Sequence, residues 1–326
     1  MLIRREFLTL VGAAGATLAA SRVARGQAYP ARTVRIIVPF PAGGPTDVMA
    51  RLVGQKLSEK LGQQFYVENH AGAGGNIGMG VAAKAAGDGY TILFVSSSYV
   101  VNTSLYQNPP YDPDKDFIPI TKAGGSAHAL FVYPGVPAKT VAELVALIKN
   151  DPKKFSVASP GIGTTPHLSS ELFKLAFGLS ELTIVPFPGG NASMQSVVAG
   201  HTPLSLQAIP PGVPFVRDGK LRALAVTASK RAAALPDVPT FDELGVKDQE
   251  AETMQGVLVP AGTPKEIVDL LYREIARILT LPDVKPKLDA LGFESEPNTP
   301  AQFDAYIKAE VAKWKRVITA AKIKQI

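Results

Sequence analysis

Short apolar runs alternate with amphipathic stretches along residues 29–326. Each run has the length of one buried strand, whereas the stretches between them repeat apolar residues three or four positions apart, as helices do. Met49, Val53, Leu57 and Leu61 show this helical spacing in the first stretch. The alternation predicts an α/β fold with largely parallel sheets. The predicted strands are residues 34–39, 65–68, 90–96, 117–122, 129–133, 155–159, 183–187, 203–209, 221–227 and 253–259.

Four predicted helices are preceded by a threonine that has Glu or Gln three residues later. Such a pair forms a capping box, in which the two side chains satisfy free backbone amides of the first helical turn. The pairs are Thr140 with Glu143, Thr240 with Glu243, Thr263 with Glu266, and Thr299 with Gln302. The last helix repeats apolar residues through Trp314, which we therefore expect in the core.

Loops rich in glycine or serine follow several predicted strands. They are residues 41–46, 71–76, 96–98, 160–165 and 188–191, and none of them contains Arg or Lys. Ligands of open α/β sheets bind outside the carboxyl ends of the strands, so these loops predict a ligand cleft between two lobes. At the first loop, Pro45 begins a helix whose free N–H groups and dipole suit a carboxylate or phosphate. An anion would be held there by N–H dipoles, hydroxyl groups and water.

The sequence offers no complete motif for catalysis, a cofactor or a metal. Residues 72–78 have the context of a dinucleotide fingerprint, but Ile77 stands where its last glycine belongs. The motifs G-x-S-x-G and H-E-x-x-H are absent, and the chain contains no cysteine. We therefore predict a binding protein that is not an enzyme and uses neither cofactor nor metal.

Two titratable residues near these loops leave alternatives open. Asp47 stands in the first turn of the helix that Pro45 begins, where it either stabilises the helix dipole or accepts a hydrogen bond from a ligand. His167 follows the loop at 160–165 and is either a ligand contact or a surface residue. An enzyme on the same scaffold, with Asp47 and His167 as an acid–base pair, is the alternative function of a different class.

Residues 1–28 are predicted to be a cleaved signal peptide. Arg4 and Arg5 precede an apolar stretch that ends near residue 20 and is shorter than the ~20 residues of a membrane span. Small residues at 26–28 suit cleavage before Tyr29. The paired arginines resemble a twin-arginine signal, with a Sec signal as the alternative; either delivers the protein to the periplasm.

The charge of the chain is nearly balanced. It contains 34 basic and 28 acidic residues, of which residues 1–28 hold four arginines and one glutamate. The remaining 30 basic and 27 acidic residues give a net charge of +3, which is too small to indicate nucleic acid as a partner. The remaining 298 residues exceed what one core usually serves, so two lobes are expected.

Motifs along the whole predicted mature chain resemble those of the tripartite tricarboxylate transporter receptors, also called Bug or TctC-like receptors. The matching segments are residues 34–48, 67–78, 88–93, 111–117, 161–167, 219–227, 235–240 and 260–267. The resemblance implies a type II periplasmic binding protein, in which two α/β lobes close on a small organic carboxylate. It also implies delivery of the ligand to a membrane permease of the tripartite type, or a sensory role beside a membrane signalling partner.

The resemblance further implies which residues bind the ligand. From the first lobe these are Phe40, Ala42, Gly43, Gly44, Thr46 and Asp47, with Ser97 and Ser98 nearby, and from the second lobe Gly163, Thr164, Thr165 and His167. Where many members carry an acidic residue facing the cleft, this chain has Gln207. An amide provides no counter-charge for an ammonium, so we expect a dicarboxylate, hydroxy acid or aromatic acid and not an amino acid.

The chain is expected to cross twice between the lobes. We predict one lobe from residues 29–124 plus 253–326 and the other from residues 125–252. The protein is expected to act as a monomer.

Overall fold

The computed structural model describes residues 29–295, 297–320 and 322–326, so the predicted signal peptide lies outside the described residues. Within them, nine strands form one sheet. The strands are β1 (Val34–Val38), β2 (Phe65–Asn69), β3 (Thr91–Ser96), β4 (Phe117–Val132), β5 (Ser156–Ser159), β6 (Thr183–Pro186), β7 (Leu204–Ala208), β8 (Arg222–Val226) and β9 (Glu252–Pro260). The helices are α2 (Pro45–Leu61), η1 (Ala73–Gly75), α3 (Asn76–Ala83), α4 (Ser98–Leu105), α5 (Val141–Asn150), η2 (Pro152–Lys154), α6 (Thr165–Phe177), α7 (Gly190–Val198), α8 (Val213–Arg217), α9 (Lys265–Leu279), α10 (Lys285–Leu291) and α11 (Pro300–Ala320).

The sheet is mixed, so the prediction of largely parallel strands is only half right. Its order is β2-β1-β3-β9-β4-β7-β5-β6, and β8 pairs with β4. β1 is parallel to β2 and β3, and β5 is parallel to β6 and β7. Every pair that includes β4 or β9 is antiparallel. These two strands connect two smaller parallel sheets, and strand pattern alone does not reveal that role.

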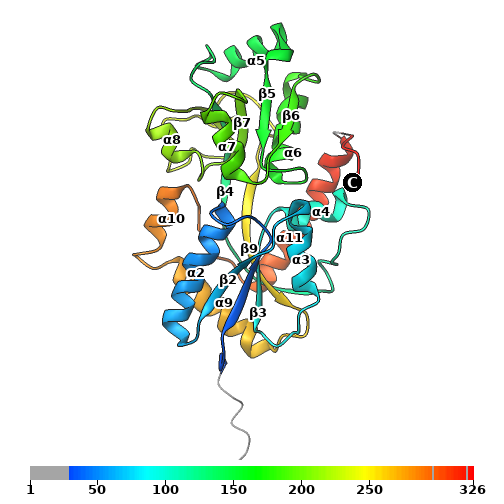
Figure 1. Cartoon of the computed structure of the whole chain (residues 1–326), viewed down its shortest axis with the longest axis vertical. Coiled ribbons are helices and arrows are strands. Elements are labelled where there is room, and N and C mark those ends of the chain that lie inside the picture. Colours follow the sequence, from blue (N-terminus) through cyan, green and yellow to red (C-terminus); the bar gives the residue numbers. More distant parts are fainter. Residues whose placement is uncertain (1–28, 296, 321) are drawn as a thin grey trace, which may run out of the picture.

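β4 is a single strand of 16 residues where the sequence predicted two. The intervening Ala-Gly-Gly-Ser looks like a break, yet Gly124 and Gly125 pair with Gln255 and Met254 of β9. The register shifts between Lys122 and Gly124, so the strand bends without leaving the sheet. Figure 1 shows β4 and β9 in the middle of the molecule, passing between its two halves.

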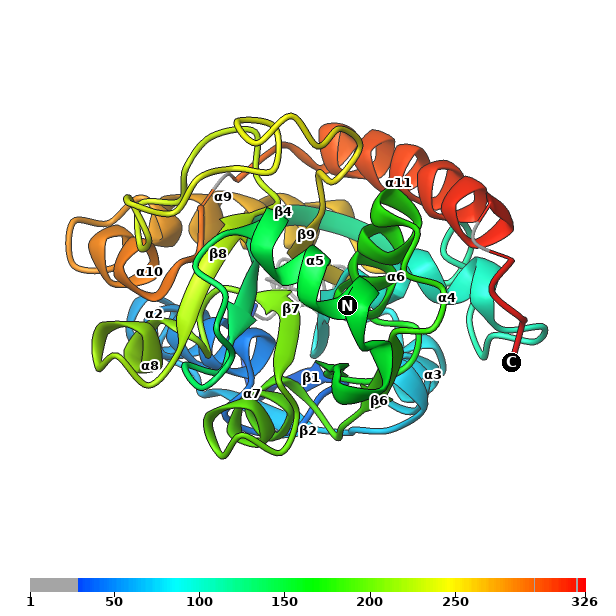
Figure 2. The same cartoon turned by 90° about the horizontal axis from the view of Figure 1, so that it is seen from above.

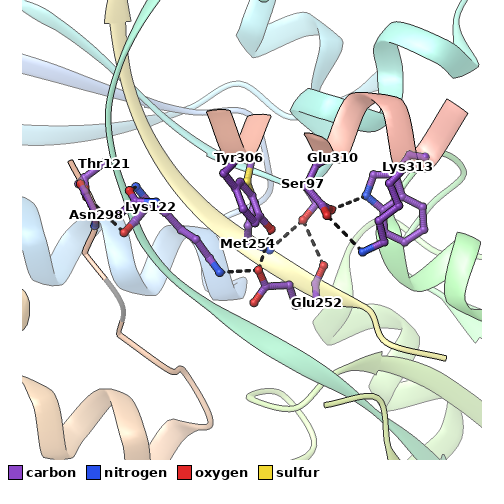
Figure 3. A network of polar contacts seen from close by, with 10 residues as sticks. Ser97, Thr121, Lys122, Glu252, Met254, Asn298, Tyr306, Glu310 and Lys313 are labelled. Carbon is purple, nitrogen blue, oxygen red and sulfur yellow. Dashed lines mark hydrogen bonds and ion pairs between the residues drawn. The ribbon is translucent and has the colours of Figure 1, made fainter. Parts of the chain in front are cut away.

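Polar contacts hold these crossing strands to α11 and to the start of α4 (Figure 3). The carboxylate of Glu252 on β9 accepts from Lys122 Nζ of β4 at 2.6 Å and from the Tyr306 hydroxyl of α11 at 2.7 Å. Ser97 Oγ accepts from the backbone amide of Met254 at 2.8 Å and lies 3.2 Å from the carbonyl of Glu252. The crossing region is thus tied to the first half of the chain and to the last helix.

Buried apolar side chains form separate clusters on the two sides of the crossing strands. One side combines β1, β3 and α2 with α9 and α11, includes the fully buried Trp314, as expected, and also takes in Leu168 of α6. The other side combines β4, β5 and β7 with α5 and α6, around residues such as Leu206 and Phe173. Figure 2 shows α9 and α11 along one side of the molecule and α7 on the opposite side. The exact lobe boundaries stay a prediction.

The complete capping box is confirmed at one of the four predicted places, where Thr299 and Gln302 form the reciprocal pair before α11. Thr140 caps α5 by accepting from the Glu143 amide, but the Glu143 carboxylate accepts from the Lys139 amide instead. Thr240 does accept from the Glu243 amide at 3.0 Å, but only a turn follows, because the chain enters a left-handed conformation at Gly245. At the fourth place the Thr263 hydroxyl donates back to the Pro260 carbonyl, and α9 begins after Pro264.

Candidate functional site

A cavity of about 90 Å³ lies where loops from both halves of the molecule meet. That volume is several times what one water molecule needs, so the cavity can admit a small organic molecule. Its lining residues follow the ends of several strands, as predicted for an α/β sheet. They belong to residues 40–46, 160–166, 188–191 and 207–211, together with Ser96 and Thr253.

Three helices begin at the wall of this cavity. The first residues of α2, α6 and α7 are Pro45, Thr165 and Gly190, and each of them lines it. The first-turn N–H groups of a helix have no partner within the helix, and the helix dipole is positive at this end. Three such ends around one small space favour an anionic ligand strongly.

The side chains of the wall supply shape and hydrogen bonds but no formal charge. Phe40, six prolines and two alanines make most of the surface apolar. The polar lining side chains are Thr46, Ser96, Thr164, Thr165, Asn191, Gln207 and Thr253. Among the described residues that line the cavity, none is Arg, Lys, Asp or Glu. A carboxylate here would therefore be bound by amides and hydroxyl groups, as expected from the loop composition.

Seven of the thirteen residues predicted from the sequence line the cavity. They are Phe40, Ala42, Gly44, Thr46, Thr164, Thr165 and Gln207. The six that do not line it are Gly43, Asp47, Ser97, Ser98, Gly163 and His167. Contact of any of these residues with a ligand stays a prediction.

Asp47 lies behind the first loop, and its carboxylate already has partners. It accepts from the amide of Gly43 at 2.8 Å, from Arg51 Nε at 2.9 Å and from Asn69 Nδ2 at 2.9 Å. Burial alone would raise the pKa of Asp47, but these hydrogen bonds and the Arg51 charge outweigh it and lower the pKa below its ordinary value. Asp47 thus holds the loop in shape as an anion, and the Gly43 amide is used by Asp47.

Gly43 also connects the first loop to α7 through Asn191, which lines the cavity. Its carbonyl accepts from Asn191 Nδ2 of α7 at 2.8 Å. Its φ is +76°, a conformation that glycine adopts without strain.

Three more of the predicted site residues, Ser97, Ser98 and Gly163, lie among neighbouring elements outside the cavity wall. Ser97 joins α4 to β9, as described above, and Ser98 Oγ is buried without a hydrogen-bond partner in the described residues. A Cβ on Gly163 would lie 2.6 Å from Leu105 Cδ2, so this glycine lets the loop at 160–165 approach α4 closely.

His167 is the second titratable residue that the sequence indicated. Its backbone amide donates to the Thr164 hydroxyl at 3.4 Å, which caps α6. Its Nδ1 is buried and has no partner among the described residues. Burial and the Lys174 charge lower the pKa of His167, against an opposing effect of Glu171. At neutral pH this imidazole is uncharged.

The sequence missed several residues of the wall. Asn191 lies in a loop that was predicted, but it was not selected as a site residue; its place after two glycines at a helix start was a usable signal. Thr253 and Pro211 gave no signal, because they reach the cavity only through the path of β9 and the turn after β7. The loop at 71–76, in contrast, was expected at the cleft and does not line the cavity.

Two further features that bear on function are metal-binding groups of side chains and helices that span a membrane. No group of three or more His, Asp or Glu side chains there is arranged to hold a metal ion. No described helix is long and apolar enough to cross a membrane.

Comparison with solved structures identifies the class of protein. A Rhodopseudomonas palustris protein solved with adipate superimposes with a TM-score of 0.88 at 34% identity, over 91% of this chain and all of that chain. The periplasmic binding protein BugD gives a TM-score of 0.86 at 34% identity, over 91% and 99%. MatC from R. palustris with bound malate gives 0.83 at 31% identity, over 89% and 100%. The fold is that of a periplasmic solute-binding protein.

Sequence comparison identifies the family. The model of the tripartite tricarboxylate transporter family receptor, TctC, matches residues 49–323. The protein BugT of Bordetella pertussis is 35% identical over 323 residues, which are 98% of this chain and 99% of BugT. This chain therefore belongs to the tripartite tricarboxylate transporter receptor family, which confirms the resemblance that its motifs indicated.

Proposed function

We propose that this protein is a periplasmic receptor that captures a small organic carboxylate in the cavity and passes it to a membrane permease of the tripartite tricarboxylate type. The observation that carries the proposal is the meeting of three helix N-termini at one cavity without a charged lining side chain among the described residues. This arrangement attracts an anion through amides and dipoles. The adipate and malate in two structures of 34% and 31% identity support a carboxylate ligand.

We infer that the bound carboxylate is a dicarboxylate, hydroxy acid or aromatic acid and not an amino acid. Gln207 supplies a neutral amide where an ammonium would need a negative charge. Asp47 does not replace that charge in this structure, because its carboxylate is 2% exposed and accepts from Gly43, Arg51 and Asn69.

The surroundings of Asp47 and His167 favour binding over catalysis. Neither residue lines the cavity. An acid–base pair must reach the reacting atoms of its substrate, whereas the Asp47 carboxylate holds the first loop and the His167 side chain lies outside the cavity wall. We propose that the receptor releases its ligand unchanged.

The proposed lobes are residues 29–124 with 253–326, and residues 125–252. The separate apolar clusters on either side of β4 and β9 support this division. Export with removal of residues 1–28 and action as a monomer complete the proposal.

A screen of the purified protein, residues 29–326, tests the ligand class. Thermal shifts would be measured with C4–C8 dicarboxylates, hydroxy acids, aromatic acids and amino acids at equal concentration. A ligand that binds only the folded state raises the melting temperature. At a free ligand concentration of 100 times Kd, the free energy of unfolding increases by ~2.7 kcal/mol. We expect a non-amino carboxylate to give the largest shift, confirmed by calorimetry. An amino acid as the tightest ligand, or no shift with any acid, contradicts the proposal.

A further inference from the structure

A buried histidine, His128, lies in the middle of a hydrogen-bond chain that ends at the cavity wall. It belongs to β4 and is fully buried. Its Nδ1 is 2.8 Å from Ser169 Oγ of α6, and its Nε2 is 2.9 Å from Thr253 Oγ1 of β9. Thr253 Oγ1 in turn lies 3.2 Å from Thr165 Oγ1, at the start of α6. Thr253 and Thr165 both line the cavity, so the chain runs from the protein interior to the ligand space.

His128 carries a single proton on its ring. Burial, with a smaller contribution from the positive charge of Lys313, lowers the pKa of His128 to about 3. A neutral imidazole donates at one nitrogen and accepts at the other. Each hydroxyl group of the chain also has only one proton to donate, so the tautomer of His128 decides whether the ring donates outwards to Thr253 or inwards to Ser169.

Only one direction gives every interior proton an acceptor. In the outward direction Ser169 donates to Nδ1, Nε2–H donates to Thr253, and Thr253 donates to Thr165. In the inward direction Nδ1–H donates to Ser169, whose own proton then needs a different acceptor. Within the described part of the chain, Ser169 Oγ has no hydrogen-bond partner other than His128. A buried hydroxyl group without an acceptor is unfavourable, so the outward direction is preferred.

The outward direction makes the end of the chain a donor. The Thr165 hydroxyl accepts from Thr253 and has its own proton free for the cavity. The first-turn amides of α2, α6 and α7 at the same wall are donors too. A carboxylate offers only acceptor oxygens, whereas an amide nitrogen or an ammonium offers only donor protons.

We propose that His128 is a positioning residue, which makes Thr253 donate to Thr165, leaves the Thr165 hydroxyl as a hydrogen-bond donor to the ligand, and thereby selects a carboxylate oxygen over a donor group. This inference rests on the proposed function, since it takes the cavity as the carboxylate site. It adds a residue that does not touch the ligand but decides what the touching hydroxyl groups can do.

The tautomer of His128 can be measured directly in the ligand-free protein. Residues 29–326 contain four histidines, so ¹⁵N-histidine labelling gives few signals. The variants His70→Gln, His167→Gln and His201→Gln assign three of them, which leaves His128. Long-range ¹H–¹⁵N spectra between pH 6 and 8 are expected to show the neutral Nε2–H form. The Nδ1–H form or an imidazolium would overturn the inference.

Two substitutions at Thr253 test the consequence for binding without replacing the buried histidine. Thr253→Val keeps the side-chain shape and removes the hydroxyl group, whereas Thr253→Ser keeps the hydroxyl group as the matched control. With adipate as the probe, we expect Thr253→Val to weaken binding about 10- to 100-fold and Thr253→Ser to stay within about 3-fold. The ratio of the affinity for adipate to the affinity for adipate monoamide should decrease in Thr253→Val and stay unchanged in Thr253→Ser. An unchanged preference in Thr253→Val would overturn the inference.

The two measurements separate this inference from the proposed function. Failure of the wild type to bind adipate or any related dicarboxylate counts against the carboxylate site itself. The tautomer of His128 is independent of ligand and still decides whether the hydroxyl chain points outwards.

Discussion

Two glycine-rich loops with the same sequence context, residues 41–46 and 71–76, have different roles. Each follows a parallel strand and precedes a helix. The first lines the cavity, and the second does not. A Cβ on Gly44 would meet only the Pro41 carbonyl, at 3.3 Å, so the remaining space is open to a ligand. A Cβ on Gly74 would meet both the Ile162 carbonyl and the Tyr106 hydroxyl at 3.3 Å.

The position of the preceding strand explains the difference. β1 lies between β2 and β3, so the loop after it opens towards the middle of the molecule. β2 is the edge strand, so the loop after it lies at the side and packs on its neighbours. Asn102 fixes that second loop by donating to the Gly74 carbonyl at 3.0 Å and to Asn76 Oδ1 at 2.8 Å. Glycine thus provides ligand access in one loop and close packing in the other.

The largest expected effect comes from filling the first loop with Gly44→Val. The backbone of Gly44 has φ −75° and ψ 167°, which valine adopts without strain, and the added methyl groups would occupy the cavity. We expect at least ~100-fold weaker carboxylate binding, about 2.7 kcal/mol, with an unchanged melting temperature. Calorimetry and thermal unfolding measure the two quantities. Unchanged affinity would place the carboxylate elsewhere.

A substitution in α3, the helix that follows the loop at 71–76, should lower stability and leave ligand affinity nearly unchanged. A Cβ on Gly78 would lie 2.8 Å from Pro39 Cα and 2.9 Å from the His70 carbonyl, both backbone atoms that cannot yield cheaply. Gly78→Ala should therefore lower the free energy of unfolding by ~2 kcal/mol while the affinity of the folded protein stays within about 3-fold.

The matched control for this substitution is Gly80→Ala in the same helix. There the nearest atom is a side-chain carbon, Pro110 Cβ, at 3.0 Å, and we expect a smaller loss in chemical denaturation. A loss of affinity without a loss of stability in Gly78→Ala would contradict our assignment of ligand access to the loop at 41–46 and close packing to the loop at 71–76.

A smaller effect, on ligand selectivity, is expected from substituting Gln207, which β7 contributes to the cavity wall. Gln207 is buried, and its Oε1 accepts from the Ser193 hydroxyl at 3.0 Å. We expect the wild type to bind a non-amino carboxylate at least ~10-fold tighter than its α-amino analogue, a difference of ~1.4 kcal/mol. Gln207→Asp should narrow or reverse that difference, because a carboxylate repels the anion and pairs with the ammonium. Tight binding of aspartate or glutamate by the wild type would show that another acid serves the ammonium.

The smallest effect concerns the link between the first loop and α7. Asn191→Ala removes the exposed hydrogen bond to the Gly43 carbonyl and one polar side chain of the wall. We expect a few-fold loss of affinity, below ~1 kcal/mol, and an unchanged melting temperature. Asn102→Ala is the comparison at the second loop, and it should lower stability instead, because it leaves the half-buried Gly74 carbonyl and the buried Asn76 Oδ1 without their donor. Equal effects of the two substitutions on stability would contradict the assignment of roles.

Much of the site was predictable because its signals are local. The strand at Ile36–Val38, the glycine turn and Pro45 at a helix start are short-range features, and they correctly indicated a loop that lines a cavity. The sequence left more open where a residue's environment depends on distant chain segments. Asp47 could be read as a ligand contact or as a helix-dipole partner, and its carboxylate accepts from Asn69 of the next strand and does not line the cavity.

The sequence by itself determined most of the strand and helix pattern, the small-residue loops, the lack of cysteine and the family, because these depend on residue order and on neighbours along the chain. The tertiary structure decided the rest. It made β4 one crossing strand, brought three helix starts to one cavity, and placed Thr253 and His128 behind its wall. Those arrangements join residues more than a hundred positions apart, and the free energy that selects them comes from burying side chains together, which no local pattern records.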